Sequence, residues 1–279
     1  MTITTRDQLI NALSNNSSRL VIDKASIPIT GVGQFHSMWR ATGQPGQGAI
    51  PAAAATCTNA LVGSFQFTQQ TAPSTSYAAY LEVVSSNSAT TLEIHDRLMH
   101  MGGLVGNVAT AQTVNLDLAA NIGVSNLTKR IGDSNYSDVQ WWLEWYADTG
   151  ATVVVATVNV TYNDGSSGEL TGISLAVTRR ASFMQPLNSL IPAVDSGKFI
   201  RAVNTVKLSV STGTAGNFGV TATRMRCSLA LPLANIKWSA DWATLPISEI
   251  PNSSCLYPIV IAGSNTTGTM RGSGKIAHG

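Results

Sequence analysis

The chain has 279 residues, of which 44% are hydrophobic and only 11% are charged, against about 25% charged residues in an ordinary soluble domain. Seventeen Lys and Arg residues against fifteen Asp and Glu give a net charge of +2 with no basic run, which excludes a nucleic-acid footprint. No apolar stretch approaches the length needed to span a bilayer, so we expect neither nucleic acid nor a membrane as a partner.

Sparse charge predicts that neighbouring subunits cover much of the surface. Between Arg40 and Glu93 the only charged residue is Glu82, and residues 251–270 carry none. A monomer with so few surface charges would be poorly soluble, and assembly would remove the problem. The alternative is a polar but uncharged surface, since Ser, Thr, Asn and Gln are plentiful.

The first 56 residues are predicted to form an extended arm. Thr5 to Gln8 resembles a capping box, and Leu9, Ile10 and Leu13 supply one apolar face, so residues 6–14 should form a short helix. The segment that follows is rich in Gly, Pro and Ala, which prevents any long regular element. Such an arm could lie in grooves of a neighbour or add a strand to its open edge.

Residues 57–279 are predicted to form the body. From residue 61 onward, short strand signals alternate with polar, Gly-rich turns, and there is little helix. This pattern predicts an all-β fold, an antiparallel β-sandwich of jelly-roll type, that ends in a Gly-rich tail. No internal repeat at a fixed period is present, which argues against a propeller or solenoid.

A tryptophan-rich stretch over residues 137–168 is the clearest strand signal. Val139, Trp141, Leu143 and Trp145 share one parity and should face the core. An alternating run over residues 154–162 follows, and a third begins at residue 170, with turns between the runs. We therefore expect a three-stranded β-meander.

Few residues suggest chemistry. His95, Asp96 and His100 form the best metal-like group, but strand parity and helical spacing both separate the histidines, so structural roles are favoured. The GSGK string at residues 272–275 lacks the first Gly and the Ser/Thr of a phosphate loop. Acidic residues are scattered, so we expect no catalytic, metal or cofactor site, no cofactor, and no enzymatic activity.

The three cysteines, Cys57, Cys227 and Cys255, are odd in number and far apart. That spacing suits reduced thiols in a cytoplasm better than a disulfide framework. The first sixteen residues also lack the basic-then-apolar plan of a signal peptide. We therefore expect assembly in a cytoplasm.

Several strings of this sequence resemble virion structural proteins of tailed bacteriophages. The strings are HDRLMHMGGLVGN, RIGDSNYSDVQWWLEWYADTGATVVVATVNVTYNDGSSG, FMQPLNSLIPAVDSGKFIRAVNTV and GSGKIAHG, and the similarity covers residues 90 to 279. The resemblance implies a non-enzymatic particle component, a capsid cement or decoration protein with a jelly-roll-like body, assembled in the bacterial host cytoplasm and located in the virion. Its expected partners are the major capsid protein and copies of itself; a trimer would suit threefold lattice positions.

Four aromatic residues are candidates for protein contacts. Phe35 and Trp39 lie on the predicted arm, and Trp142 and Tyr146 lie on the strand parity that should face water. The alternative for Trp142 and Tyr146 is that they fill a second layer of the same domain. Two other functions remain open: a tail, baseplate or fibre component of the phage particle, and a carbohydrate-binding β-sandwich in which aromatic residues stack on sugars.

Overall fold

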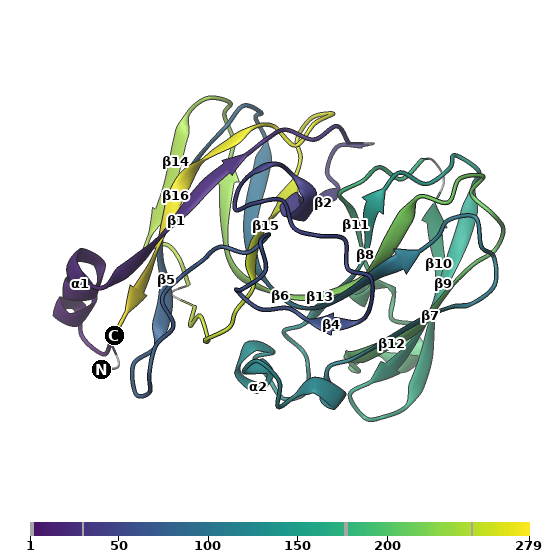
Figure 1. Cartoon of the computed structure of the whole chain (residues 1–279), viewed down its shortest axis with the longest axis horizontal. Helices are drawn as coiled ribbons and strands as arrows, with labels where there is room; N and C mark the ends of the chain where they lie inside the picture. Colours follow the sequence, from purple (N-terminus) through teal and green to yellow (C-terminus); the bar gives the residue numbers. More distant parts are fainter. Residues whose placement is uncertain (1–2, 30, 176–177, 247) are drawn as a thin grey trace. The chain divides into compact units, whose positions relative to one another are not determined.

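The computed structural model describes residues 3–29, 31–175, 178–246 and 248–279, and it confirms the predicted all-β antiparallel fold (Figure 1). Strands make up 45% of the chain and helical residues 10%. The chain forms two compact units. Unit 1 comprises Met1–Ala49, Thr58–Asp96 and Met225–Gly279, and unit 2 comprises Ile50–Cys57 and Arg97–Arg224.

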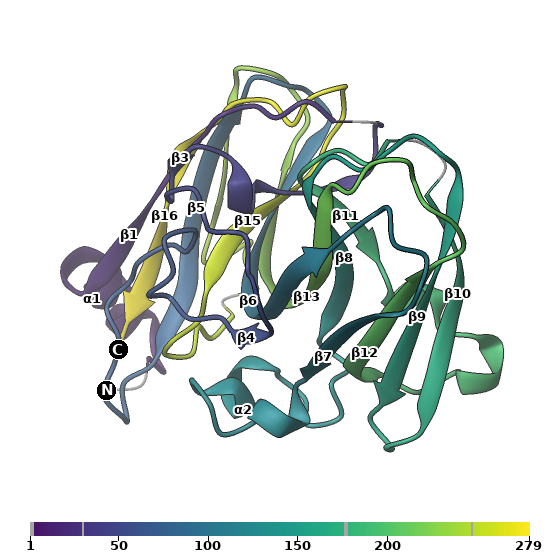
Figure 2. The same cartoon turned by 45° about the vertical axis from the view of Figure 1, so that its right-hand side comes forward.

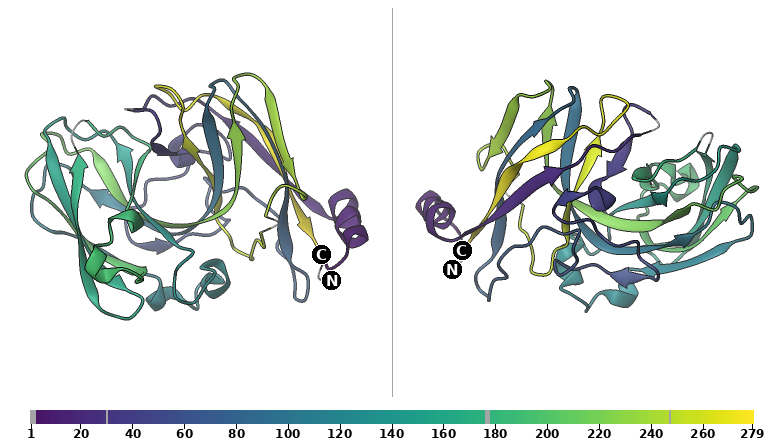
Figure 3. Two further views of the ribbon diagram at one scale, coloured as in Figure 1. Left: turned by 180° about the vertical axis from the view of Figure 1, so that it is seen from behind. Right: turned by 45° about the horizontal axis from the view of Figure 1, so that its top comes forward.

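The first layer of unit 1 is a five-stranded antiparallel sheet (Figures 1 and 2). In order across the sheet its strands are β14 (Lys237–Asp241), β5 (Ser76–Ser85), β16 (Met270–His278), β1 (Ser17–Lys24) and β3 (Gly43–Gln44). The longest continuous register in the sheet joins β1 to β16, from Ser17 opposite Ala277 to Lys24 opposite Met270. Strands from the two ends of the chain are therefore neighbours, as the right-hand view of Figure 3 shows.

A second layer faces this sheet across the core of unit 1. It contains β2 (Phe35–Ser37), β15 (Leu256–Ile261) and the first part of β6 (Thr90–Leu104), paired antiparallel. Alternate residues of β1 point inward, so Leu20 and Ile22 are buried against Leu92 and Val260 within one apolar cluster. Unit 1 is thus a β-sandwich.

Helix α1 (Arg6–Asn15) packs on the outer face of that first sheet. Its N-terminus carries the expected capping box, in which the Thr5 side chain accepts from the Gln8 N–H and the Gln8 side chain accepts from the Thr5 N–H. Leu9 and Ala12 are buried against Ala79 of β5 and Ala277 of β16. The predicted helix over residues 6–14 is therefore confirmed, and small side chains on the sheet let it lie close to the strands.

The predicted division into an arm over 1–56 and a body over 57–279 differs from the two units observed. Residues 17–24 form a strand between β16 and β3, and Leu20 and Ile22 belong to the core of unit 1. Residues 25–56 contain only short strands, as the Gly and Pro content predicts. The sequence pattern does not indicate the pairing of β1, because its partner β16 lies at the opposite end of the sequence.

Unit 2 is a second β-sandwich. One layer is the antiparallel sheet β10 (Ser167–Leu175), β9 (Val154–Tyr162), β12 (Ile200–Leu208) and β7 (Gln112–Asp117). The other layer contains β13 (Asn217–Leu231), β8 (Gln140–Ala147) and β11 (Phe183–Pro186), and β4 (Ala55–Thr56) pairs with β6. The remaining elements are α2 (Leu127–Arg130) and the 3-10 turns η1 (Met38–Arg40), η2 (Ala119–Asn121), η3 (Asn188–Leu190) and η4 (Ala193–Asp195).

The tryptophan-rich strand lies in the core as predicted, but the meander was wrong. Trp141, Leu143 and Trp145 of β8 are completely buried in the apolar cluster of unit 2. The β9–β10 hairpin exists, whereas β8 pairs with β13 and β11 in the opposite layer. The chain crosses between layers after β8, and alternation alone does not distinguish a crossing from a hairpin. Val177, which belongs to the predicted third run beginning at residue 170, lies outside the described residues.

Candidate binding surfaces

The most strongly bonded polar group in unit 2 is a buried cluster around Arg97. Its guanidinium donates to both carboxylate oxygens of Glu144, at 3.1 and 2.6 Å, and to the hydroxyl of Tyr146 at 2.7 Å. Its Nε donates to Nδ1 of His100 at 2.9 Å. All four residues are nearly inaccessible to solvent, so the cluster holds β6 to β8 and offers no surface to a substrate.

Histidines in both units are kept neutral by their surroundings. Burial, followed by the positive charge of Arg97, lowers the pKa of His100 to about 2. Burial alone lowers the pKa of His36, on β2 of unit 1, to about 4. A histidine that stays neutral at physiological pH can accept a hydrogen bond but cannot carry charge to a ligand, so these two groups serve structure.

His95, Asp96 and His100, the metal-like group in the sequence, each bond to a different partner. Asp96 accepts from Arg226 at 2.9 Å and from the backbone N–H of Cys255 at 2.8 Å. His95 lies 2.8 Å from a carboxylate oxygen of Glu93. Within the described ranges, no group of three or more His, Cys, Asp or Glu side chains is arranged to hold a metal ion.

The four aromatic residues proposed for protein contacts are mostly interior. Trp39 is 1% exposed, donates to the carbonyl of Ala49 at 2.8 Å and packs edge-on against Tyr257. Trp142 and Tyr146 are also buried in unit 2, the former donating to the Thr223 hydroxyl at 2.8 Å. Phe35 is half-buried. Side chains as buried as Trp39, Trp142 and Tyr146 leave a partner little to touch.

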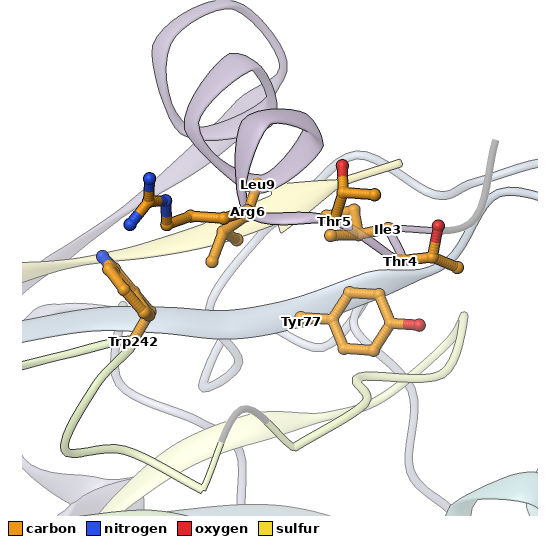
Figure 4. Close-up of a pocket in the computed structure, with 7 residues that line it drawn as sticks. All are labelled: Ile3, Thr4, Thr5, Arg6, Leu9, Tyr77 and Trp242. Atoms are coloured by element: carbon orange, nitrogen blue, oxygen red, sulfur yellow. The ribbon is translucent and has the colours of Figure 1, made fainter.

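The clearest open recess lies beside helix α1 and is named here the helix groove (Figure 4). It has a volume of about 320 Å³ and is lined by Ile3, Thr4, Thr5, Arg6, Leu9, Tyr77 and Trp242. Trp242 follows β14 and is 37% exposed, and the side chain of Arg6 extends toward it along the helix. A smaller recess of about 220 Å³ continues from Trp242 past Leu13 and Tyr80. The two linings share Trp242 and together include the charged side chains of Arg6, Asp241 and Lys275.

A second recess runs along the free side of β1 and is named the edge groove. It has a volume of about 500 Å³ and is lined by Arg19, Leu20, Val21, Gln44, Pro45, Gly46, Ala60, Val62, Ser64, Phe65 and Gln66. Two of its apolar side chains are open to solvent, Val21 at 46% and Val62 at 67% exposure. Arg19 is the single charged side chain in this lining.

Sequence reasoning missed both grooves. Trp242 follows a strand of only five residues, and Val21 belongs to a strand whose partners were not recognised. Of the signals available, the outward parity of Arg19 and Val21 in the run from Ser17 to Lys24 could have placed them on a solvent face. Nothing local indicated that residues 44–46 and 60–66 would line the same recess.

Comparisons with known proteins identify no family for this chain. No family model matches the sequence, and no curated protein does. Solved structures of the infectious bursal disease virus capsid protein align over most of the chain. The VP2 subviral particle is 11% identical over 94% of this chain and 79% of its own, with a TM-score of 0.22; the Gt strain structure is 11% identical over 96% and 86%, with a TM-score of 0.23. TM-scores this low do not establish a shared fold or function.

No helix in the described part of the chain is long and apolar enough to cross a membrane.

Proposed function

We propose that the chain is a non-enzymatic structural protein of a tailed-phage virion, a cement or decoration protein that binds the outer surface of the capsid shell. Its partners would be the major capsid protein and copies of itself. Support comes first from the sequence strings between residues 90 and 279 that resemble such proteins. It comes second from the two sandwich units, each with its own apolar core, since a cement protein needs a stiff body.

The observation that carries the proposal is the distribution of charged and apolar side chains. Charged residues that could activate a substrate are buried in ion pairs. These pairs are Arg97 with Glu144 and Asp96 with Arg226. Apolar side chains are instead presented outside, among them Val21 and Val62 in the edge groove. A surface that offers apolar grooves rather than reactive groups is suited to contact with other protein subunits.

Co-sedimentation with empty shells tests the proposal. Wild-type protein should pellet with shells that lack it, and Val62→Asn should reduce the bound fraction because it places an amide in the apolar recess. Val194→Asn is the matched control, since Val194 is 88% exposed in unit 2 and lines neither groove. Wild-type protein that stays in the supernatant at all shell concentrations would refute the cement function; binding to isolated tails instead would favour a tail or baseplate component.

The helix groove supports one alternative, a carbohydrate-binding β-sandwich. Tyr77 and Trp242 both line the groove, and aromatic rings are the side chains on which sugars stack. Thr4, Thr5 and Arg6 line the same space (Figure 4). A glycan-binding screen decides between the two: sugar binding that Trp242→Ala abolishes, by a protein that ignores shells, would favour the alternative.

A further inference from the structure

The edge of β1 is open over its middle residues. Among the described residues, β3 pairs with β1 only at Asp23 and Lys24, and Pro45 follows directly after β3. The ammonium group of Lys24 also donates to the carbonyls of Pro45 at 2.6 Å and Ala41 at 3.0 Å, which fixes the turn away from the strand. At the far end of β1, the Thr68 N–H donates to the side chain of Ser18 at 2.9 Å. The open stretch lies between these two contacts.

The alternation of an antiparallel strand shows which backbone groups face this opening. Asp23 pairs with Gln44, and the Ala25 N–H donates to Thr42, so odd-numbered residues of β1 direct their N–H and C=O toward β3. Asn16 accepts from His278 on the β16 side, which agrees with that alternation. The N–H and C=O of Arg19 and Val21 therefore point into the edge groove. Among the described residues, none hydrogen-bonds to these four groups on that side.

The groove beside these backbone groups is lined by apolar and uncharged polar side chains together with one positive charge. Val21 and Val62 supply exposed apolar surface, while Arg19 makes no ion pair with any described residue. No acidic side chain in the described part of the chain lines the recess. Asp23, the nearest acid on β1, pairs with Arg271 at 3.3 Å.

We propose that the edge groove is a strand-docking site for an extended segment of a partner protein, one that alternates apolar residues and carries a carboxylate side chain. The segment would add to β1 as an edge strand, its backbone bonding to Arg19 and Val21, its apolar side chains against Val62, and its carboxylate at Arg19. An open edge of this kind otherwise favours non-specific pairing, and the flanking contacts restrict it to a short stretch. The identity of the partner, a capsid subunit, rests on the proposed function; the site itself does not.

Amide hydrogen exchange on the full chain, followed by NMR, tests the site without any particle. In the free protein, the amides of Leu20 and Ile22, which face β16, should exchange slowly, and those of Arg19 and Val21 should exchange fast. The probe is a blocked six-residue peptide that alternates valine and threonine and contains one glutamate. At about nine times its Kd, the factor 1 + [L]/Kd predicts an about tenfold slowing at Arg19 and Val21.

Variant peptides and variant proteins separate strand docking from non-specific adsorption. A peptide with lysine in place of the glutamate should bind more weakly, and Arg19→Glu should reverse that preference. Lys237→Glu, on the opposite edge strand of the same sheet and itself exposed, should leave the preference unchanged. A peptide methylated on the amides that face β1 should not slow exchange at all.

Four results would overturn the assignment. Amides of Arg19 and Val21 already as protected as their neighbours would show that the edge is closed. No slowing at any soluble peptide concentration would show that it does not accept a strand. Protection that grows with protein concentration alone would assign the edge to a second copy of this chain. Shell binding by a protein whose Arg19 and Val21 amides ignore the peptide would retain the proposed function and reject this site.

Discussion

The Arg97 guanidinium and the Glu144 carboxylate lie 2.6 Å apart at their closest, with exposures of 0% and 1%. Thr221 and Tyr146 also donate to the Glu144 carboxylate, and Arg97 donates further to His100. Charges so far from solvent are stabilised only while every partner is present, because their desolvation is not otherwise offset. The pair therefore makes the positions of β6 and β8, which both pair with β13, sensitive to single substitutions.

Glu144→Gln should lower the free energy of unfolding by about 3 to 5 kcal/mol, because it leaves Arg97 as an uncompensated buried charge. The double variant Arg97→Met/Glu144→Leu should lose less than either single variant. Urea denaturation followed by far-UV circular dichroism measures both. The control is Arg271→Gln, which breaks the exposed pair with Asp23 and should cost at most about 1 kcal/mol. Equal losses in the buried and exposed variants would contradict this reading.

The ring of Trp39 has no room for an added methyl group at two neighbouring glycines. A Cβ on Gly63 would lie 2.5 Å from the ring, and one on Gly48 would lie 2.1 Å from it. Gly63→Ala should therefore destabilise unit 1 by about 1 to 3 kcal/mol through overpacking. Gly123→Ala, where a Cβ meets nothing within 4 Å, is the matched control and should be neutral or better. Calorimetric melting temperatures of the two variants should differ accordingly.

Acid should weaken unit 1 through His36. Burial lowers the pKa of His36 from 6.5 to about 4, so between these values the unfolded chain binds the extra proton and the folded chain does not. The free energy of unfolding is therefore not reduced by His36 above pH 6.5. It falls as the pH drops from 6.5 toward 4, by up to about 3 kcal/mol at 1.36 kcal/mol per pH unit. His36→Gln should show a shallower decline of unfolding free energy across this window. Parallel curves for variant and wild type would contradict the assignment.

Truncations should separate helix α1 from strand β1. Removing residues 1–15 takes away the contact of Leu9 with the sheet, which contributes roughly 1.5 to 3 kcal/mol, and unit 1 should still fold. Removing residues 1–24 also deletes β1, with Leu20 and Ile22 from the core, and unit 1 should fail to fold while unit 2 keeps its own core. Near-UV circular dichroism and limited proteolysis distinguish these outcomes. A folded unit 1 in the longer truncation would restore the extended-arm interpretation.

The sequence revealed local patterns better than long-range partners. The parity of Trp141, Leu143 and Trp145 predicts their burial correctly, because alternation depends only on strand geometry. Glu144 lies between them on the parity of Trp142 and Tyr146, and nothing near it in sequence identifies its buried partner, since Arg97 is 47 residues away. The same limit applies to Val21, whose groove is completed by residues up to Gln66. Alternation identifies the face of a strand and not what covers it.

The order of the two units along the chain has a consequence for synthesis. Unit 2 is contained in residues before 225, whereas the first sheet of unit 1 needs β14 and β16, which come after it. A ribosome therefore finishes unit 2 while β1 and β5 still lack the strand that lies between them. Until β16 emerges from the ribosome, both strands have unpaired edges that are exposed to other chains. Pairing of β16 with β5 and β1 is therefore a late step, and it completes the first sheet of unit 1.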